Sequence, residues 1–116
     1  MLIEEPPPGE ERDAAYAADR DSDGYVWNVT RLWGWRADVY RDFAALRDSL
    51  MGSSSLTDRD WAVLVTATAS QLGDSYCSLA WGAKLARLTD AETAAQLIAN
   101  EPAPALSERE QMLAAW

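Results

Sequence analysis

Apolar side chains recur at helical spacing in the middle of the chain. Over residues 38–51 they step by four, three and four residues, at Val39, Phe43, Leu46 and Leu50. Such steps place side chains on one face of an α-helix, whereas a strand alternates with a period of two. The pattern therefore predicts a helix with one apolar stripe, ended by the Gly-Ser-Ser-Ser run that follows it.

A second helix is predicted from Thr57 to about Leu72. Thr57 is a favoured N-cap residue, and the carboxylate of Asp60, three positions later, completes a capping box. Residues 62–69 are apolar nearly all round. We therefore expect this helix at the centre of the core.

Three further helices are indicated by their start and stop signals. Gly73 separates the second helix from a third, which begins at Asp74 and ends near Leu88. Capping boxes then predict helix starts at Thr89 and Ser107, with a Pro-rich loop between these two helices. The last helix stops at the chain end after about two turns, so we expect it to be truncated here or completed elsewhere.

The N-terminal part of the chain carries weaker signals. Residues 1–13, which include three consecutive prolines, are expected to form a flexible acidic arm, and residues 14–20 a short helix. Val26, Val29 and Trp33 share one helical face, which favours a short buried helix over a strand.

No segment shows the two-residue period of a strand, so the predicted fold class is all-α. About six helices joined by short loops are expected, in a single domain over residues 14–116. The chain also contains six tryptophans. Such residues more often form a core or a subunit interface than a ligand cage, and we expect a homo-oligomer.

Charge narrows the range of partners. The chain has 10 basic and 19 acidic residues, for a net charge of −9. Nucleic acid is disfavoured because binding to phosphates requires clustered Lys and Arg, and an anionic membrane surface is disfavoured for the same reason. Most of the excess lies in residues 1–23, where eight acids and two bases give −6.

The chain contains one cysteine and no histidine. This composition excludes an intramolecular disulfide, a structural zinc site and histidine-dependent nucleophilic catalysis. No cofactor or metal is predicted. No apolar run approaches the ~18 residues of a membrane span, and the acidic, Pro-rich start is unlike a signal peptide. A cytoplasmic location is expected.

Cys77 is the strongest nucleophile in the sequence. It is expected at the third position of the helix that Asp74 caps, where the helix dipole favours a thiolate and the carboxylate opposes one. We expect the carboxylate to cancel or outweigh the dipole unless it is turned onto the backbone as a cap, and a buried apolar role for Cys77 is the alternative. For Asp74 two roles are open, helix cap and general base. Tyr76 is expected to pack in the core or to donate a hydrogen bond, and Ser75 is expected to be an ordinary first-turn residue.

Four segments, in this order along the chain, carry a family resemblance: Gly24–Val29, the helix with Phe43, Leu56–Asp60, and Gly73–Cys77 with the helix beyond it. Together they resemble the carboxymuconolactone decarboxylase / alkylhydroperoxidase D family, and within it the peroxidase-related branch. The resemblance covers roughly residues 14–116. It implies an all-helical protein that assembles as a trimer or hexamer.

The peroxidase members of that family have a Cys-x-x-Cys-x-x-x-His helix start and a glutamate on the preceding helix. Read without gaps, Cys77 matches the second cysteine of the motif. The first cysteine, the histidine and the glutamate fall on Asp74, Trp81 and Ala62. We therefore take Cys77, Asp74 and Tyr76 as catalytic candidates, and Ala62, Trp81 and Ser75 as candidates for lining a pocket.

Three functions are open. The leading hypothesis is thiol-dependent peroxide reduction, through a sulfenic acid at Cys77 that an external thiol resolves. The second is a non-redox enzyme in which Asp74 and Tyr76 handle a small apolar or carboxylated substrate. The third is a non-catalytic oligomer that binds a ligand or partner, motivated by the lost catalytic positions.

Overall fold

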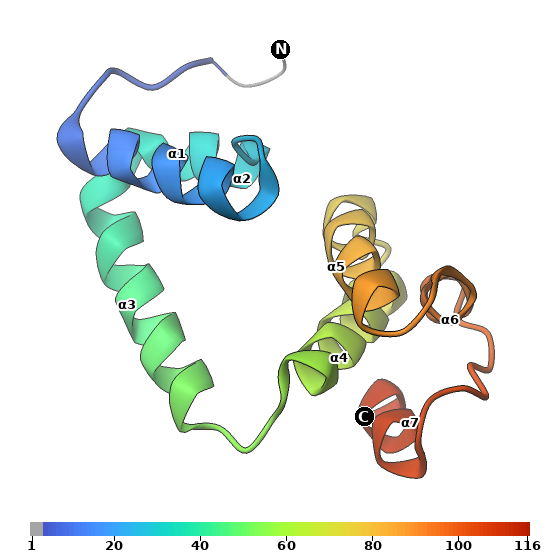
Figure 1. Cartoon of the computed structure of the whole chain (residues 1–116). Coiled ribbons are helices and arrows are strands. Elements are labelled where there is room, and N and C mark those ends of the chain that lie inside the picture. Colours follow the sequence, from blue (N-terminus) through green and yellow to red (C-terminus); the bar gives the residue numbers. More distant parts are fainter. Residues whose placement is uncertain (1–3) are drawn as a thin grey trace. The chain divides into compact units, whose positions relative to one another are not determined.

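The computed structural model describes residues 4–116, which form seven α-helices and one 3₁₀ helix and no strand (Figure 1). The predicted all-α fold class is therefore confirmed. The chain divides into two compact units, one ending at Ser54 and the other beginning at Ser55. The single domain expected over residues 14–116 stays a prediction.

The first unit contains α1 (Glu10–Asp23), α2 (Asn28–Trp33), the 3₁₀ helix η1 (Gly34–Arg36) and α3 (Ala37–Ser53). The start predicted for the first helix, at residue 14, is too late. Glu10, Glu11 and Asp13 place three carboxylates in the first turn of α1, where the helix dipole favours negative charge. Residues 1–3 of the predicted flexible arm lie outside the described residues.

The segment before α1 packs on its own unit. Pro6 is fully buried and lies so close to Gly34 that a β-carbon there would overlap the proline ring. Arg12 donates from Nη1 to the Pro6 carbonyl oxygen at 2.9 Å. The Tyr16 hydroxyl donates to the Glu5 carboxylate at 3.0 Å. These contacts hold the acidic segment against α1 and η1.

The short helix predicted around Val26 is present as α2, but its buried face differs from the expectation. Val26 is buried but lies before the helix, and within the helix Thr30 is the residue that is buried. Val29, expected to be buried, is exposed. Because the helix begins at Asn28 rather than at Val26, the spacing from Val26 does not define one helical face.

The apolar stripe of α3 is helical, as predicted, and it is exposed. Its four members are between 38% and 61% exposed: Val39, Phe43, Leu46 and Leu50. At the start of the stripe the Trp33 ring stacks on Tyr40 and Phe43, with centroid distances of 5.6 and 5.5 Å. The periodicity thus gave the helix correctly and left open what covers its apolar face.

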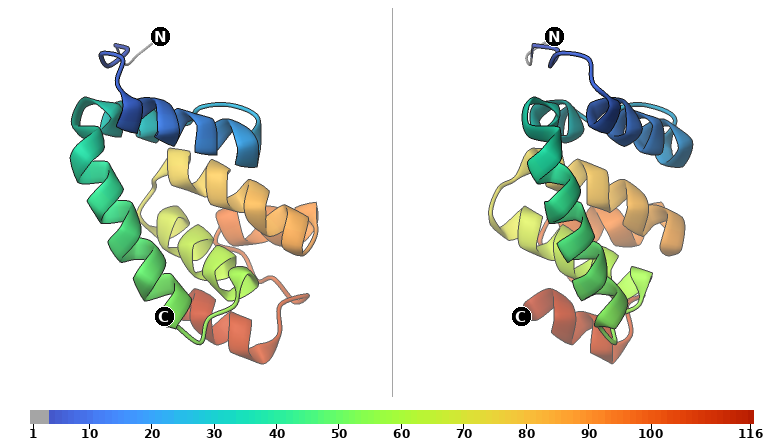
Figure 2. Two further views of the ribbon diagram at one scale, coloured as in Figure 1. Left: turned by 60° about the vertical axis from the view of Figure 1, so that its left-hand side comes forward. Right: turned by 90° about the vertical axis from the view of Figure 1, so that its left-hand side faces the viewer.

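The second unit contains α4 (Asp58–Gln71), α5 (Ser75–Leu88), α6 (Ala91–Ile98) and α7 (Glu108–Ala115) (Figure 2). Helix α4 packs against each of the other three helices, as its apolar sequence predicts. The buried core residues are Ala62, Val63, Ala67, Leu85, Ala94, Leu97, Ala103 and Leu106. The central position predicted for the helix from Thr57 is confirmed within this unit.

Helices α4 and α7 each begin with a capping box, and ion pairs connect the two capping boxes. The capping boxes predicted at Thr57/Asp60 and Ser107/Glu110 are both present. Arg59 of α4 pairs with Glu110, and Arg109 of α7 pairs with Asp60 at 3.3 Å. Each capping carboxylate is therefore bound both by its own helix start and by an arginine of the other helix.

The start of α6 corrects one prediction. The N-cap is Asp90 rather than Thr89, because the Asp90 carboxylate accepts from the backbone N–H of Thr93 at 2.8 Å and from its hydroxyl at 2.7 Å. The Thr89 hydroxyl instead donates to the carbonyl of Leu85 at the end of α5. Aspartate is as good an N-cap as threonine, so the adjacent pair was ambiguous in sequence.

Within residues 4–116, no helix combines the length and the apolar character that crossing a bilayer requires.

Candidate functional site

The turn between α4 and α5 sets the position of the candidate thiol. Gly73 adopts a left-handed conformation with φ of 68°, and its N–H bonds to the Ser70 carbonyl. The Asp74 N–H reaches back to Ala69 at 2.9 Å. This pair of bonds is a Schellman motif, which needs a residue free of β-carbon strain at the left-handed position. The motif ends α4 and lets α5 begin at the next residue.

Asp74 is the N-cap of α5, and Cys77 is its third residue, as predicted. The backbone N–H of Cys77 donates to Oδ1 of Asp74 at 3.0 Å. This bond, with a second one from the thiol, holds the pKa of the Asp74 carboxyl below its usual range. Burial raises the pKa of the Cys77 thiol, and the hydrogen bond and negative charge of Asp74 raise it further.

The electrostatics of this helix start favour a protonated thiol. A thiolate would lose its hydrogen bond to Asp74 and face a carboxylate on the same turn. The nucleophilic form of a cysteine is the thiolate, so Cys77 is a weak nucleophile at neutral pH. Cys77 is also half-buried rather than sealed in the core. The Asp74 carboxylate is turned onto the backbone as a cap, and it still adds to the effect of burial in raising the pKa of the thiol.

The other candidates fall into two groups. Ser75 and Tyr76 are exposed on the first turn of α5, beside Cys77. Ala62 is fully buried in the core of the second unit, and Trp81 packs against that core with Lys84 Nζ 4.9 Å from its ring centroid. The two positions onto which the glutamate and histidine of the resembled family fall are therefore occupied by packing residues.

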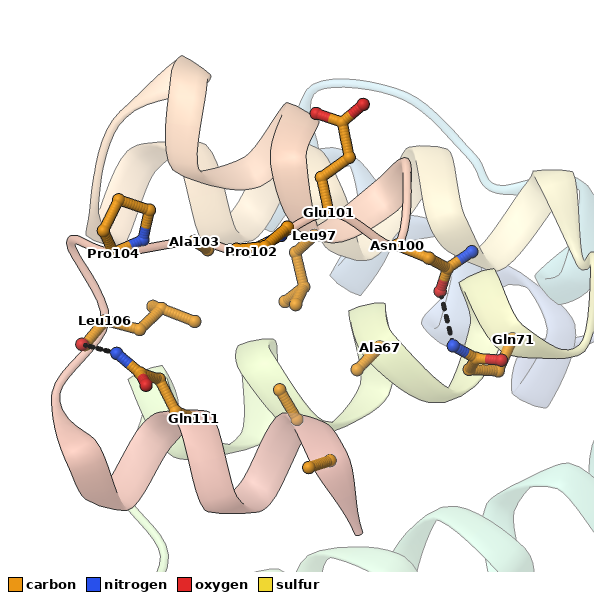
Figure 3. Close-up of a pocket in the computed structure, with 12 residues that line it drawn as sticks. Ala67, Gln71, Leu97, Asn100, Glu101, Pro102, Ala103, Pro104, Leu106 and Gln111 are labelled. Atoms are coloured by element: carbon orange, nitrogen blue, oxygen red, sulfur yellow. Dashed lines mark hydrogen bonds between the residues drawn. The ribbon is translucent and has the colours of Figure 1, made fainter.

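A cavity of about 480 Å³ lies elsewhere in the second unit (Figure 3). Its walls come from α4, the end of α6, the loop that follows and α7. The lining residues are Ala67, Gln71, Leu97, Asn100, Glu101, Pro102, Ala103, Pro104, Leu106, Gln111, Ala114 and Ala115. None of the six candidate residues is among them. The sequence marked this loop by its prolines but gave no sign that it would enclose a space against α4.

Metal binding has no support in the described part of the chain, since no three His, Cys, Asp or Glu side chains gather there as a ligand set.

The chain matches no family model, and neither the curated protein sequences nor the solved structures contain a match to it. The resemblance to the carboxymuconolactone decarboxylase / alkylhydroperoxidase D family therefore stays a prediction.

Proposed function

We propose that this chain is a carboxymuconolactone decarboxylase-like helical protein that reduces peroxides slowly through Cys77, using an external thiol as reductant. The observation that carries the proposal is the placement of one half-buried thiol at the start of α5, hydrogen-bonded to Asp74. Burial and the same hydrogen bond keep the thiolate fraction small near neutral pH, and this small fraction limits the rate of attack on peroxide.

The chemistry needs one thiol and a second substrate. Cys77 loses its proton, its sulfur attacks the outer oxygen of the peroxide, and the O–O bond breaks. The departing oxygen takes up a proton as an alcohol or water, leaving a sulfenic acid. An external thiol then forms a mixed disulfide with loss of water. A second external thiol releases Cys77 and carries away the disulfide.

Asp74 and Tyr76 have distinct roles in this scheme. Asp74, whose pKa is lowered, is a poor acceptor of the thiol proton and acts mainly to hold the thiol in place. Tyr76 is exposed on the same turn and is the candidate donor of a hydrogen bond to the departing oxygen. A trimeric or hexameric assembly belongs to the same proposal, because the family resemblance implies it. A reducing cytoplasmic setting also belongs to it, because the sequence has a single cysteine and a start unlike a signal peptide.

The test is sulfenic acid formation, measured by mass spectrometry after dimedone trapping across a pH series. The yield should rise with pH through the alkaline range and disappear in Cys77→Ser. Asp74→Asn should move the profile to lower pH, because it keeps a capping oxygen and removes the charge. Ser75→Ala, on the same turn, is the control and should leave the profile unchanged. Absence of trapped product at every pH, in a folded protein, would sink the proposal.

The raised pKa of Cys77 also supports a second candidate, a non-catalytic ligand-binding protein on the same scaffold. A thiol held protonated beside a carboxylate is suited to packing and hydrogen bonding rather than to turnover. This candidate predicts that Cys77→Ala leaves ligand binding and stability nearly unchanged. A non-redox enzyme would instead lose activity with Asp74→Asn while Cys77→Ala remained active.

A further inference from the structure

The apolar stripe of α3 is left largely uncovered by the unit to which it belongs. Figure 1 shows α3 leading away from α1 and α2 after its first turns. The exposed fraction of the stripe residues rises along the helix, from 38% at Val39 to 61% at Leu50. At the start of the stripe, the stacked ring of Trp33 supports Phe43, with 5.5 Å between the ring centroids. A continuous exposed apolar face of this kind marks an interaction surface.

The spacing of the stripe is that of a coiled-coil seam. Its members follow one another after four, three and four residues, as the a and d positions of a seven-residue repeat abcdefg do. Phe43 and Leu50 take the a positions, and Val39 and Leu46 take the d positions. All four lie on one continuous helix, because α3 spans Ala37–Ser53. A helix with this seam pairs lengthwise with a helix of the same spacing.

Two charged side chains border the seam, one on each edge. In the same repeat, Asp42 is a g position and Arg47 is the e position five residues later. Within one chain, Asp42 pairs with Arg41 and Arg47 pairs with Asp48, each at 2.9 Å and between exposed sequence neighbours. Exposed ion pairs of this kind are weak, so both side chains can exchange partners at low cost.

The two edge charges favour a second copy of the chain, in parallel orientation. When two copies of α3 lie parallel, the g position of one faces the e position five residues later in the other. Asp42 of one copy then faces Arg47 of the other, and two-fold symmetry repeats the pair on the opposite edge. In an antiparallel pair, g edges meet each other and e edges meet each other, which brings like charges together. Charge complementarity is therefore present in the parallel pair and absent from the antiparallel one.

We infer that α3 forms a parallel two-stranded contact between two copies of this chain, with the apolar stripe as its seam and Asp42 paired with Arg47 across it. The contact involves α3 and not Cys77, so it does not depend on the proposed peroxide chemistry. A hexamer with two-fold axes can contain this contact, whereas a three-fold trimer cannot.

Sedimentation velocity of the full chain tests whether the seam associates. The wild-type chain should self-associate with a Kd of about 10–100 μM, because the seam is short. Leu46→Lys places a charge in the seam and should leave a single chain up to about 500 μM. Ala45→Lys is the matched control, because Ala45 is exposed on α3 outside the seam. This control should associate as the wild-type chain does.

Exchange of the edge charges tests the choice of partner. Asp42→Arg and Arg47→Asp should each weaken self-association by about tenfold, because like charges then face each other in both pairs. An equal mixture of the two variants should associate as tightly as the wild-type chain. In that mixture each chain supplies the charge that the other lacks, so both pairs are restored.

A disulfide reports the orientation of the two helices. In a Cys77→Ser background, the thiol of Leu50→Cys lies beside its counterpart in a parallel pair, but roughly 16 Å from it along an antiparallel one. Oxidised glutathione, as the oxidant, should therefore link two such chains, seen as a dimer on a non-reducing gel. Asp48→Cys is the control, because Asp48 is exposed on the opposite face of α3 and should not cross-link.

Several results would overturn the inference. A wild-type chain that stays single up to about 500 μM removes the contact. If that chain also loses folding stability in Leu46→Lys, the stripe is covered within one chain. Unchanged association in Leu46→Lys places the contact elsewhere. A trimer, a mixture no tighter than either charge variant, or absence of the Leu50→Cys cross-link contradicts the parallel two-fold pairing.

Discussion

Two helix junctions in the second unit begin alike and end differently. Helices α4 and α6 both stop in a Schellman motif, with Gly73 and Asn100 at the left-handed position. After Gly73 the next residue, Asp74, already caps α5. After Asn100 the chain runs through two prolines before Ser107 caps α7.

The distance to the next cap decides what each junction becomes. At the α4–α5 junction there is no room between the helices, and the cap carboxylate contacts the thiol of the new first turn. At the α6–α7 junction the intervening loop stands off from α4 and lines a pocket that is half open to solvent. The same helix-ending motif thus places a thiol beside a carboxylate at one junction and a pocket-lining loop at the other.

The largest expected effect comes from releasing the far end of the α6–α7 junction. Glu110 accepts from the Ser107 backbone and hydroxyl at 2.8 and 2.9 Å and pairs with Arg59. Glu110→Ala removes these bonds from a buried group and should lower the free energy of unfolding by about 2–3 kcal/mol in urea titrations. Glu108→Ala, exposed on the same turn, is the control and should change it by less than ~0.5 kcal/mol.

Lowering the pH should also destabilise the start of α7, at the far end of the α6–α7 junction. The pKa of Glu110 is lowered mainly by Arg59, and that of Asp60 mainly by the Thr57 backbone N–H. A carboxyl whose pKa is lower in the folded than in the unfolded protein contributes its full stabilisation of the fold above the unfolded pKa. That stabilisation is lost as the pH falls through the folded pKa. The free energy of unfolding should therefore hold from pH 7 to about 5 and decline below. Glu110→Ala should make the decline shallower, and an unchanged slope would contradict this assignment.

A smaller loss of folding stability is expected from a substitution at Gly73, where the α4–α5 junction begins. Gly73→Ala places a β-carbon at φ of 68° and should cost about 1–2 kcal/mol by thermal or urea unfolding. Gly52→Ala is the matched control, because Gly52 is helical with nothing within 4 Å of the added carbon. That control should be neutral or stabilising. Equal losses at both positions would show that the left-handed conformation is not the cause.

The smallest change in stability is expected at the corresponding residue of the other junction. Asn100→Gly keeps the left-handed conformation and removes the amide that Gln71 contacts. The free energy of unfolding should move by less than about 0.5 kcal/mol in urea titrations. A loss as large as that of Gly73→Ala would mean that the Gln71–Asn100 bond, rather than the backbone turn, holds α6 in place.

Local signals were sufficient for three of the helix starts, those of α4, α5 and α7. The capping boxes at Thr57 and Ser107 and the cap at Asp74 each lie within one turn of chain, so their residue types alone predicted them. Where two adjacent residues both suit a cap, as at Thr89 and Asp90, the capping pattern alone did not single out the right one. The effect of Asp74 on the pKa of Cys77 could be predicted because both residues lie on one turn, but burial, the largest cause of the raised pKa, could not.

Features that depend on contacts between distant segments could not be predicted from the sequence. The spacing of Val39 and Phe43 predicted a helix but not whether its apolar face would be covered. The cavity requires Gln71 and Asn100, 29 residues apart, to meet across two helices. Neither residue carries a local pattern that marks a binding site, so only the folded chain brings the amide pair together.

Gly82 has a consequence for how this protein can change over time. A β-carbon at Gly82 would overlap the end of the Ile98 side chain, which fills the space that glycine leaves between α5 and α6. A larger residue at position 82 therefore requires the Ile98 side chain to turn away or to become smaller. Ala115 is exposed at the cavity wall and can grow without a compensating change. Substitutions along α7 would therefore change the shape of this pocket while the α5–α6 contact stays as it is.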